Sequence, residues 1–217
     1  MNELPIIKNR LAFFVFSIAI TIVCVYAIAV YGFKLGIDFS GGTLWQVQFE
    51  REDVGADALK EFFVSRGFED VLVTPEPASR SFQMRLGVVD AAKKAELSEA
   101  LASEFGNSID LRFDSIGPAI GAELKQKAIW ATILVLLGIS LYVAYAFSSV
   151  SYPVSSWRYG IVTLVTLFHD VIIAVGTLAF LSKFFHADVD TNSVVAVLVV
   201  LGFSVHDTIV VFDRVRE

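Results

Sequence analysis

The sequence has one cysteine, Cys24, and only 18% of its 217 residues are charged. A single thiol cannot form a disulfide within the chain, which excludes a disulfide-stabilised scaffold. The net charge of −6 by itself says little about nucleic acid, and no nucleic-acid partner is predicted. In so apolar a chain, the division of charge between loops is more informative than the total.

Long hydrophobic runs take the place of charge. Hydrophobic residues make up 55% of the chain, and the mean hydropathy is +0.66. Four runs approach the roughly 20 residues that a helix needs to cross about 30 Å of hydrocarbon. We therefore predict an α-helical integral membrane protein with transmembrane helices at residues 11–31, 128–147, 159–181 and 191–212.

The first run resembles a secretory signal peptide, because Lys8 and Arg10 precede it and residues 27–29 (AIA) offer a cleavage motif. It is longer than the usual signal core of about 7 to 15 residues. We interpret it as an uncleaved anchor that follows a short N-terminal segment, residues 1–10.

Residues 33–127 show helix and strand periodicity in place of unbroken apolar sequence. Asp90 is the expected N-cap of one helix, and Gly67 is expected at the C-terminal end of another. A turn with Pro75 and Pro77 is expected between two strands. The predicted strands are 43–49, 68–74, 81–86 and 109–116, and the predicted helices are 57–66 and 90–104.

The resulting βαββαβ order is typical of an inserted α+β ferredoxin-like domain, a fold with many unrelated functions. Glycine-rich segments flank this domain at 36–42 and 117–121. They lack the Lys and Ser/Thr of a phosphate-binding loop, so we interpret both as tight turns where the domain meets the membrane.

Basic residues in the short loops predict the orientation. If the spans alternate in direction, five basic residues lie on the same side of the membrane. The 182–190 loop, on the other side, contains Lys183 but also the acidic residues Asp188 and Asp190. Basic loops face the cytoplasm. The N-terminus and residues 213–217 are therefore predicted to be cytoplasmic and the 33–127 domain periplasmic, in a bacterial inner membrane. The five residues are Lys8, Arg10, Arg158, Arg214 and Arg216.

Acidic residues interrupt the last two runs at Asp170 and Asp207. A carboxylate in hydrocarbon is costly unless it faces protein or water, so we first treat both as functional. At about 1.5 Å per residue, they lie about 18 Å and about 10 Å from the cytoplasmic rim. Carboxylates at two depths suit a stepped proton path, in which the neighbouring His169 and His206 are further candidate relay groups.

These polar residues also have plainer interpretations. Asp207 could hydrogen-bond a neighbouring helix for packing alone, and Asp170 with His169 could form a structural contact with another helix. Residues Asp213, Arg214 and Arg216 form a charged motif that would anchor the last helix at the cytoplasmic surface.

The two His-Asp pairs raise two further alternatives. Adjacent residues on a helix point about 100° apart, so one pair cannot direct both side chains to one ion, and neither a metal nor a cofactor is predicted. An intramembrane aspartyl protease would use two carboxylates from neighbouring helices. Its GxGD signature is missing, since Asp207 follows the residues SVH, but this enzyme remains the rival hypothesis.

Four motifs stand in order along the chain: GIDFSGG (36–42), SIGPAIGAEL (115–124), HDV (169–171) and GFSVHDTIVVFDRVRE (202–217). Together they resemble the SecF family, the smaller membrane subunit of the bacterial SecDF protein-export complex. The resemblance implies an accessory subunit of the Sec translocon, of the resistance-nodulation-division type, that uses proton-motive force to help pull preproteins across the membrane. Its implied partners are SecD, the SecYEG translocon, the translocating preprotein and membrane lipid.

By the same resemblance, Asp207 matches the family's essential acidic residue in the fourth span, and residues 213–217 match its DRxRE ending. His206 stands where the family often has Asn, which adds a second titratable group. The family has six spans, so the resemblance implies two spans after Glu217 and, within them, a basic residue that faces Asp207.

One mechanism joins these expectations. Asp207 takes a proton from the periplasmic side and releases it inward, and its change of charge shifts helix packing and moves the outer domain. The alternative is a passive assembly subunit whose spans dock a larger partner. Small residues such as Gly138, Ser140 and Gly176 suit both hypotheses.

Overall fold

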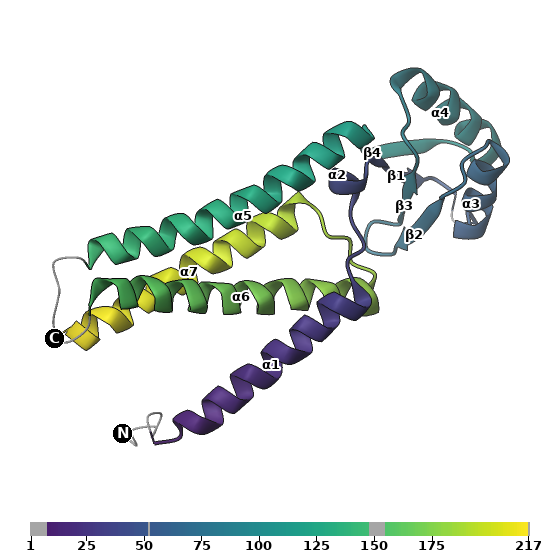
Figure 1. Ribbon diagram of the computed structural model, residues 1–217. Coiled ribbons are helices and arrows are strands. Elements are labelled where there is room, and N and C mark those ends of the chain that lie inside the picture. Colours follow the sequence, from purple (N-terminus) through teal and green to yellow (C-terminus); the bar gives the residue numbers. More distant parts are fainter. Residues whose placement is uncertain (1–7, 52, 148–154, 217) are drawn as a thin grey trace. The chain divides into compact units, whose positions relative to one another are not determined.

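The computed structural model describes residues 8–51, 53–147 and 155–216, which fall into two compact units (Figure 1). One unit is helical and lies within residues 1–35 and 127–217. The other is an α/β unit of residues 36–126, inserted after the first long helix.

Four long helices form the first unit. They are α1 (Arg10–Tyr31), α5 (Pro118–Ala146), which starts in the α/β unit, α6 (Ser156–Phe185) and α7 (Thr191–Arg216). Each is long and apolar enough to cross a membrane. Large apolar side chains such as Phe14 and Leu134 are about two-thirds exposed, at 65% and 64%. Such a surface is stable in lipid and costly in water, which makes this a membrane protein.

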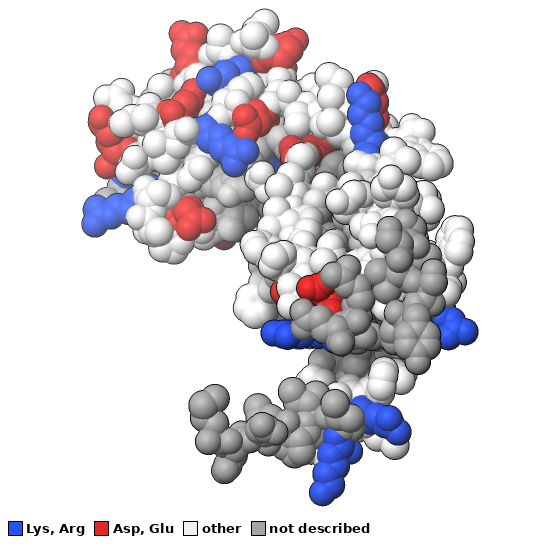
Figure 2. Space-filling model, turned by 90° about the vertical axis from the view of Figure 1, so that its left-hand side faces the viewer, with Lys and Arg blue, Asp and Glu red and all other residues white. Residues whose placement is uncertain are grey.

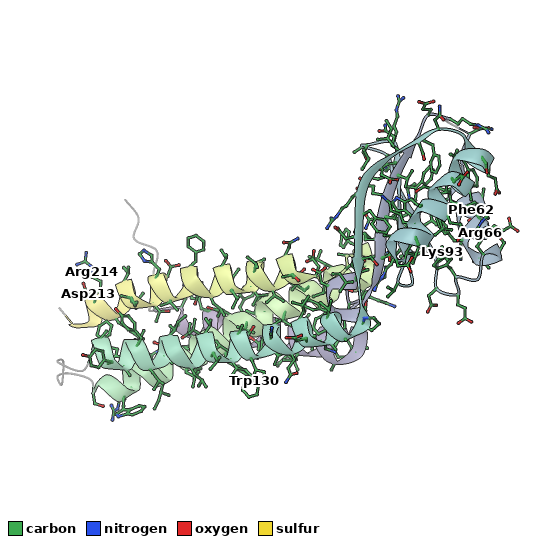
Figure 3. The ribbon with its side chains drawn as sticks, turned by 90° about the horizontal axis from the view of Figure 1, so that it is seen from above. Phe62, Arg66, Lys93, Trp130, Asp213 and Arg214 are labelled. Carbon is green, nitrogen blue, oxygen red and sulfur yellow. The ribbon has the colours of Figure 1, made fainter. Side chains whose placement is uncertain are left out.

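Charge is distributed accordingly. Figure 2 shows acidic and basic side chains scattered over the α/β unit, while most of the helical surface is uncharged. Trp130, on α5, is 56% exposed and extends away from the helix, as an aromatic residue in contact with lipid does (Figure 3).

Helix α5 begins ten residues before the predicted span. Proline fits the first helical position because its missing N–H would have no partner there, and Pro118 is the first residue of α5. The N–H of Gly121 donates to the carbonyl of Gly117 at 3.1 Å. The interpretation of residues 117–121 as a tight turn is therefore wrong, because this segment is the first turn of α5.

The first glycine-rich segment holds the short helix α2 (Ile37–Ser40) and packs against that first turn. A Cβ on Gly41 would lie 2.9 Å from Cα of Pro118, and one on Gly121 would lie 2.9 Å from the backbone nitrogen of Gly41. Gly41 also has a φ of +74°. Glycine is thus required at positions 41 and 121 because the backbones of the two motifs touch there.

The α/β unit is an antiparallel four-stranded sheet with the order β2-β3-β1-β4. Its elements are β1 (Gly42–Phe49), α3 (Ala56–Ser65), β2 (Leu72–Glu76), β3 (Ser81–Leu86), α4 (Ala91–Phe105) and β4 (Ser108–Ile116). This order confirms the ferredoxin-like prediction. With the four apolar helices, it confirms the predicted fold class.

Strand β2 differs from its prediction of 68–74. It starts at Leu72 and continues through Pro75, which pairs with Phe82 of β3. Proline is tolerated there because β2 is an edge strand that needs no N–H on its outer side. Phe68 instead packs as part of the core, and its ring meets that of Phe63 edge-on at 5.9 Å.

The core lies between the sheet and its two helices. Trp45 and Val47 of β1 are fully buried against Leu59 and Phe63 of α3 and Leu97 of α4. Burial of each such side chain stabilises the fold by roughly 1.5–3 kcal/mol. The Trp45 indole N–H donates to Asp110 Oδ1 at 2.9 Å, so the ring is buried without an unsatisfied donor.

The ends of the two helices follow the sequence prediction. The Asp90 carboxylate accepts a hydrogen bond from the Lys93 N–H at 2.7 Å, which makes Asp90 the N-cap of α4. Gly67, with a φ of +90°, directly follows Arg66, the C-cap of α3. Next to it, the Arg66 guanidinium lies 3.5 Å from the centre of the Phe62 ring (Figure 3).

Candidate functional site

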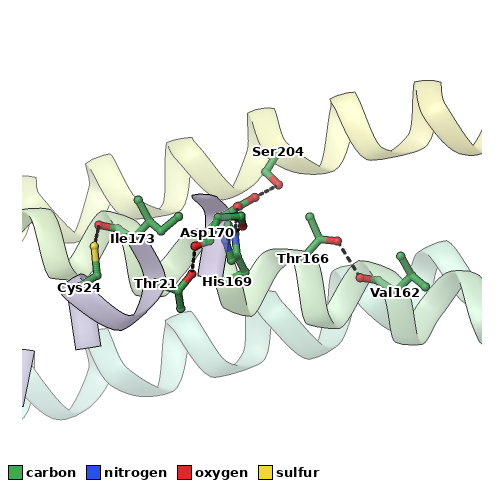
Figure 4. Close-up of polar contacts among 9 residues, drawn as sticks. Thr21, Cys24, Val162, Thr166, His169, Asp170, Ile173 and Ser204 are labelled. Atoms are coloured by element: carbon green, nitrogen blue, oxygen red, sulfur yellow. Dashed lines mark hydrogen bonds and ion pairs between the residues drawn. The ribbon is translucent and has the colours of Figure 1, made fainter. Parts of the chain in front are cut away.

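A chain of polar side chains joins three of the long helices (Figure 4). Ser17 Oγ of α1 lies 2.7 Å from His169 Nε2 of α6. His169 Nδ1 lies 2.9 Å from Asp170 Oδ1, and the Ser204 hydroxyl of α7 donates to Asp170 Oδ2 at 2.5 Å. Asp170 therefore has a hydrogen-bond partner on each oxygen, one from its own helix and one from the next.

Close packing of α1 against α6 sets this geometry. A Cβ on Gly176 would lie 2.3 Å from Cβ of Cys24, so only glycine allows the two backbones to approach so closely. Ser17 and His169 each lie seven residues, about two turns, before this contact, on the same faces of their helices. The hydrogen bond between them follows from that shared spacing.

Two hollows lie along the groove between α6 and α7. One, of about 410 Å³, includes Thr177, Ser193 and Asp170 in its lining. The other, of about 440 Å³, is bordered by Asp170, Ser204 and Asp207. Asp170 borders both hollows, so the two acidic residues that the sequence singled out meet at one cavity.

Asp207 differs from Asp170 in its surroundings. It is exposed and, within residues 8–51, 53–147 and 155–216, its carboxylate has no hydrogen-bond or ion-pair partner. It lies three residues after Ser204, on the same face of α7. His206 is also exposed but does not border the cavity, so the structure separates it from the other three predicted relay residues.

Two kinds of hydroxyl contact occur along α1, α6 and α7 near this groove. The hydroxyls of Thr163, Thr166 and Thr177 donate to carbonyls four residues earlier in α6, at 2.8–2.9 Å. The hydroxyls of Ser17 and Ser204 instead reach another helix. Sequence reasoning missed both serines. Ser204 could have been identified because it lies three residues before Asp207 and so shares its helix face. Nothing in the first apolar run distinguishes Ser17 as a functional residue.

The charged motif lies at the C-terminal end of α7 (Figure 3), where Asp213 and Arg214 are exposed. The side chain of Arg216 and all of Glu217 lie outside the described residues. Just before the motif, the Phe212 ring packs edge-on against Tyr159 of α6 at 4.9 Å and against Phe147, the residue after α5, at 5.8 Å. These three rings fix the end of α7 against two other helices.

The opposite end of α7 is tied to the segment after α1. Lys34 Nζ lies 3.3 Å from Asp188 Oδ1, and the Val189 N–H donates to the Lys34 carbonyl at 2.8 Å. The Lys34 N–H donates to Ser182 Oγ at 2.8 Å. We call these contacts the strap. They connect the loop before α7 to Leu35, the residue before the α/β unit.

Asp190 caps α7 directly after the strap. Its carboxylate accepts hydrogen bonds from the Ser193 N–H at 2.9 Å and from the Ser193 hydroxyl at 2.8 Å. Burial acts to raise the pKa of Asp190, but the hydrogen bonds from Ser193 and Asn192 outweigh it and hold the pKa below its ordinary value. The strap and cap fix the start of α7.

The His-Asp pairs show no metal-binding geometry. Within the described ranges, no group of three or more His, Cys, Asp or Glu side chains could hold an ion. His169 directs its Nδ1 to the neighbouring carboxylate and its Nε2 to Ser17, so both ring nitrogens are already engaged.

Comparison with known proteins gives consistent similarities. Residues 96–217 match the model of the family described as protein export membrane protein SecD/SecF, C-terminal, and residues 26–53 match the SecD/SecF GG motif. The protein translocase subunit SecF of Thermobaculum terrenum is 42% identical over 99% of this chain and 70% of its own length. SecF of Anaerolinea thermophila is 33% identical over 99% of this chain and 69% of its own length.

Solved structures agree with the sequence comparison. The crystal structure of SecDF from Thermus thermophilus, a translocon-associated membrane protein, matches 98% of this chain with a TM-score of 0.78 and 27% identity. The SecDF structure in the super-membrane-facing form matches 96% with a TM-score of 0.56 and 28% identity. The chain spans 28% of the first SecDF chain and 27% of the second.

Proposed function

Because the chain belongs to the SecD/SecF family of protein-export membrane proteins, we propose that it is an accessory membrane subunit of the Sec translocase and that Asp170 and Asp207 carry protons along α6 and α7. The observation that carries the proposal is the cavity that both carboxylates border. A membrane helix rarely holds an acidic residue, and two acids at one cavity suit a proton path.

Proton transfer changes the charge of the cavity. Ionised Asp207 favours water or a basic partner, whereas protonated Asp207 tolerates an apolar environment. Each state therefore favours a different packing of α7 against its neighbours, and the proton gradient shifts the balance between them. A basic residue that faces Asp207 is the expected partner of the ionised form.

The strap gives this movement a route to the α/β unit. The loop before α7 and the segment after α1 share an ion pair and one backbone hydrogen bond, and the Lys34 N–H also donates to the Ser182 hydroxyl near the end of α6. A shift of α7 at its N-terminal end is therefore passed to Leu35 and on into the α/β unit. That unit would contact the preprotein, with SecD and SecYEG as the partners of the helices and lipid around them.

The orientation follows from the charges at the helix ends. Lys8, Arg10 and the end of α7 with Arg214 lie in the cytoplasm, and the α/β unit lies on the periplasmic side. Membrane-impermeant thiol labelling of intact cells, with Cys24 replaced by Ala, should modify S103C on α4 and leave K8C unmodified. The reverse pattern would invert this topology.

The protease alternative is less favoured by the contacts of Asp170. Two catalytic carboxylates of that class share one proton. Here both oxygens of Asp170 are engaged by His169 and Ser204. No covalent chemistry is part of the proposal.

Asp207→Asn in the full-length protein tests the proton-coupling step. Reconstituted with SecD and SecYEG, the wild type should export a preprotein faster when a proton gradient is imposed, and an uncoupler should remove that gain. The variant should export at the uncoupled wild-type rate with or without the gradient. If the variant kept the full gain, Asp207 would not couple export to the gradient, and a passive assembly subunit would remain.

A further inference from the structure

The most informative polar contact in the membrane unit is the bond between Ser204 and Asp170. It is the hydrogen bond that joins α6 to α7 beside the cavity, at 2.5 Å. Ser204 is partly buried, and its hydroxyl donates to the carboxylate and not to its own helix. A serine in a membrane helix usually bonds the carbonyl four residues earlier, as Ser140 does with Leu136 at 2.7 Å.

Ser204 is also close to both carboxylates, because it bonds Asp170 and is one helical turn from Asp207. It borders the cavity together with Asp170 and Asp207, and it shares a face of α7 with Asp207, three residues away. The cavity of about 440 Å³ has room for several waters, each of which occupies about 30 Å³ in the liquid.

We propose that the Ser204 hydroxyl is the relay that passes protons between Asp170 and Asp207. A hydroxyl can do this because it donates one proton and accepts another. This inference rests on the proposed function, since it assigns a path between the two acids of the proton-coupling step.

The transfer balances without any further reactant. Protonated Asp170 gives its proton to Ser204 Oγ, while Ser204 gives its own hydroxyl proton to a water in the cavity. That water passes a proton to the Asp207 carboxylate. Asp170 ends as a carboxylate, Asp207 ends protonated, and Ser204 and the water are unchanged. Rotation of the hydroxyl then restores its hydrogen bond to Asp170.

The other hydroxyls of the groove are less suited to the role. Thr166 and Thr208 border the same cavity, but the Thr166 hydroxyl is bonded to the Val162 carbonyl at 2.9 Å, and within the described residues no hydrogen bond joins Thr208 to Asp170. The remaining titratable groups near the relay are His169, bonded to Asp170, and His206, which does not border the cavity. The geometry therefore favours Ser204 as the link.

Proton flux through the reconstituted full-length complex tests the relay. Vesicles that contain a pH-sensitive dye receive an imposed pH gradient, and the rate of internal pH change is measured. Ser204→Ala should lower the flux roughly tenfold, the loss expected when a hydrogen bond to a charged group is removed. Ser204→Thr keeps the hydroxyl and should restore most of the flux.

Ser140→Ala is the matched control, because it removes the same atoms from another membrane helix and should leave flux near the wild-type rate. Co-purification with SecD checks that each variant folds and assembles. Unchanged flux in Ser204→Ala, or equal losses in the Ala and Thr variants, would overturn the relay. Asp207→Asn separates the two ideas: if it abolishes flux while Ser204→Ala does not, only the relay fails, and if it leaves flux intact, the proposed function fails.

Discussion

At the scale of single residues, glycines allow close backbone contacts and serines hydrogen-bond the polar groups of the membrane helices. Gly41 and Gly121 are needed because their backbones touch, and Gly176 is needed because Cys24 lies against it. Ser17 and Ser204 fix the orientation of the His169–Asp170 pair from two sides. None of these roles is visible in hydropathy, which treats small residues in an apolar run as nearly neutral.

Gly121→Ala tests the backbone contact. Alanine favours a helix over glycine by about 1 kcal/mol, but the new Cβ would meet backbone atoms of Gly41 and Phe39 at 2.9–3.3 Å. We expect a net loss of about 1–3 kcal/mol in the free energy of unfolding of the full chain. Denaturant unfolding in detergent measures it.

Gly87→Ala is the control for that substitution, because no atom lies within 4 Å of its added Cβ. Its unfolding free energy should stay within about 0.5 kcal/mol of wild type. Equal stability of the two variants would show that the contact between the motifs is not tight.

The positions of the two acidic residues could be predicted from the sequence, but their contacts could not. Asp170 and Asp207 stood out because a carboxylate in an apolar run is costly, and the structure brings both to one cavity. Their proton-carrying role stays a prediction. The partners of Asp170 could not be foreseen, because helical spacing shows which residues share a face but not which helix lies opposite.

At the scale of elements, α7 is held at both ends and contacts α6 along a hollowed groove. Phe147, Tyr159 and Phe212 pack together at one end, and the strap and the Asp190 cap lie at the other. Between them, two open hollows border α6 and α7, while Leu201 of α7 is fully buried. A helix that is fixed at its ends and bordered by hollows can respond to a local change of charge.

The cap of α7 should make stability depend on pH. Because the folded-state pKa of Asp190 lies below its ordinary value, its carboxylate stabilises the fold above about pH 4, the usual aspartate value. This contribution should disappear as the pH falls through the lowered folded-state pKa. The measured quantity is the unfolding free energy of wild type minus that of Asp190→Asn, between pH 7 and pH 2.

Asparagine also caps helices well, so the comparison isolates the charge and not the cap. The difference should be largest near neutral pH and should shrink in acid. A difference that stayed constant across this range would mean that the carboxylate is not stabilised in the folded state.

Secondary structure was predictable wherever one pattern dominated. The four apolar runs and the βαββαβ order were evident from periodicity alone. Strand β2 was misplaced because Pro75 was interpreted as a turn residue, whereas it sits on an edge strand. The start of α5 was misplaced because the glycine-rich segment 117–121 was interpreted as a turn, whereas Pro118 begins a helix. In both places, the secondary structure that the proline adopts depends on the neighbouring element, which the sequence does not identify.

At the scale of the whole molecule, the chain combines a membrane-embedded charge site with a polar domain inserted between its helices. The covalent link between them at Leu35 is held by the strap to the loop before α7. We propose that a proton-dependent change in the membrane helices reaches the α/β unit through this covalent connection. The other segments of the export complex are expected to cover the exposed face of α7 around Asp207.

The central claim is that the Asp207 side chain gains and loses a proton as the membrane is energised. Infrared difference spectroscopy of the full-length complex in vesicles, with Asp207→Asn as the reference, measures the carboxyl signal of this residue directly. We expect a protonated-carboxyl band that rises or falls when the gradient is imposed and that is absent in the variant. A band for Asp207 that stayed the same with and without the gradient would contradict the claim.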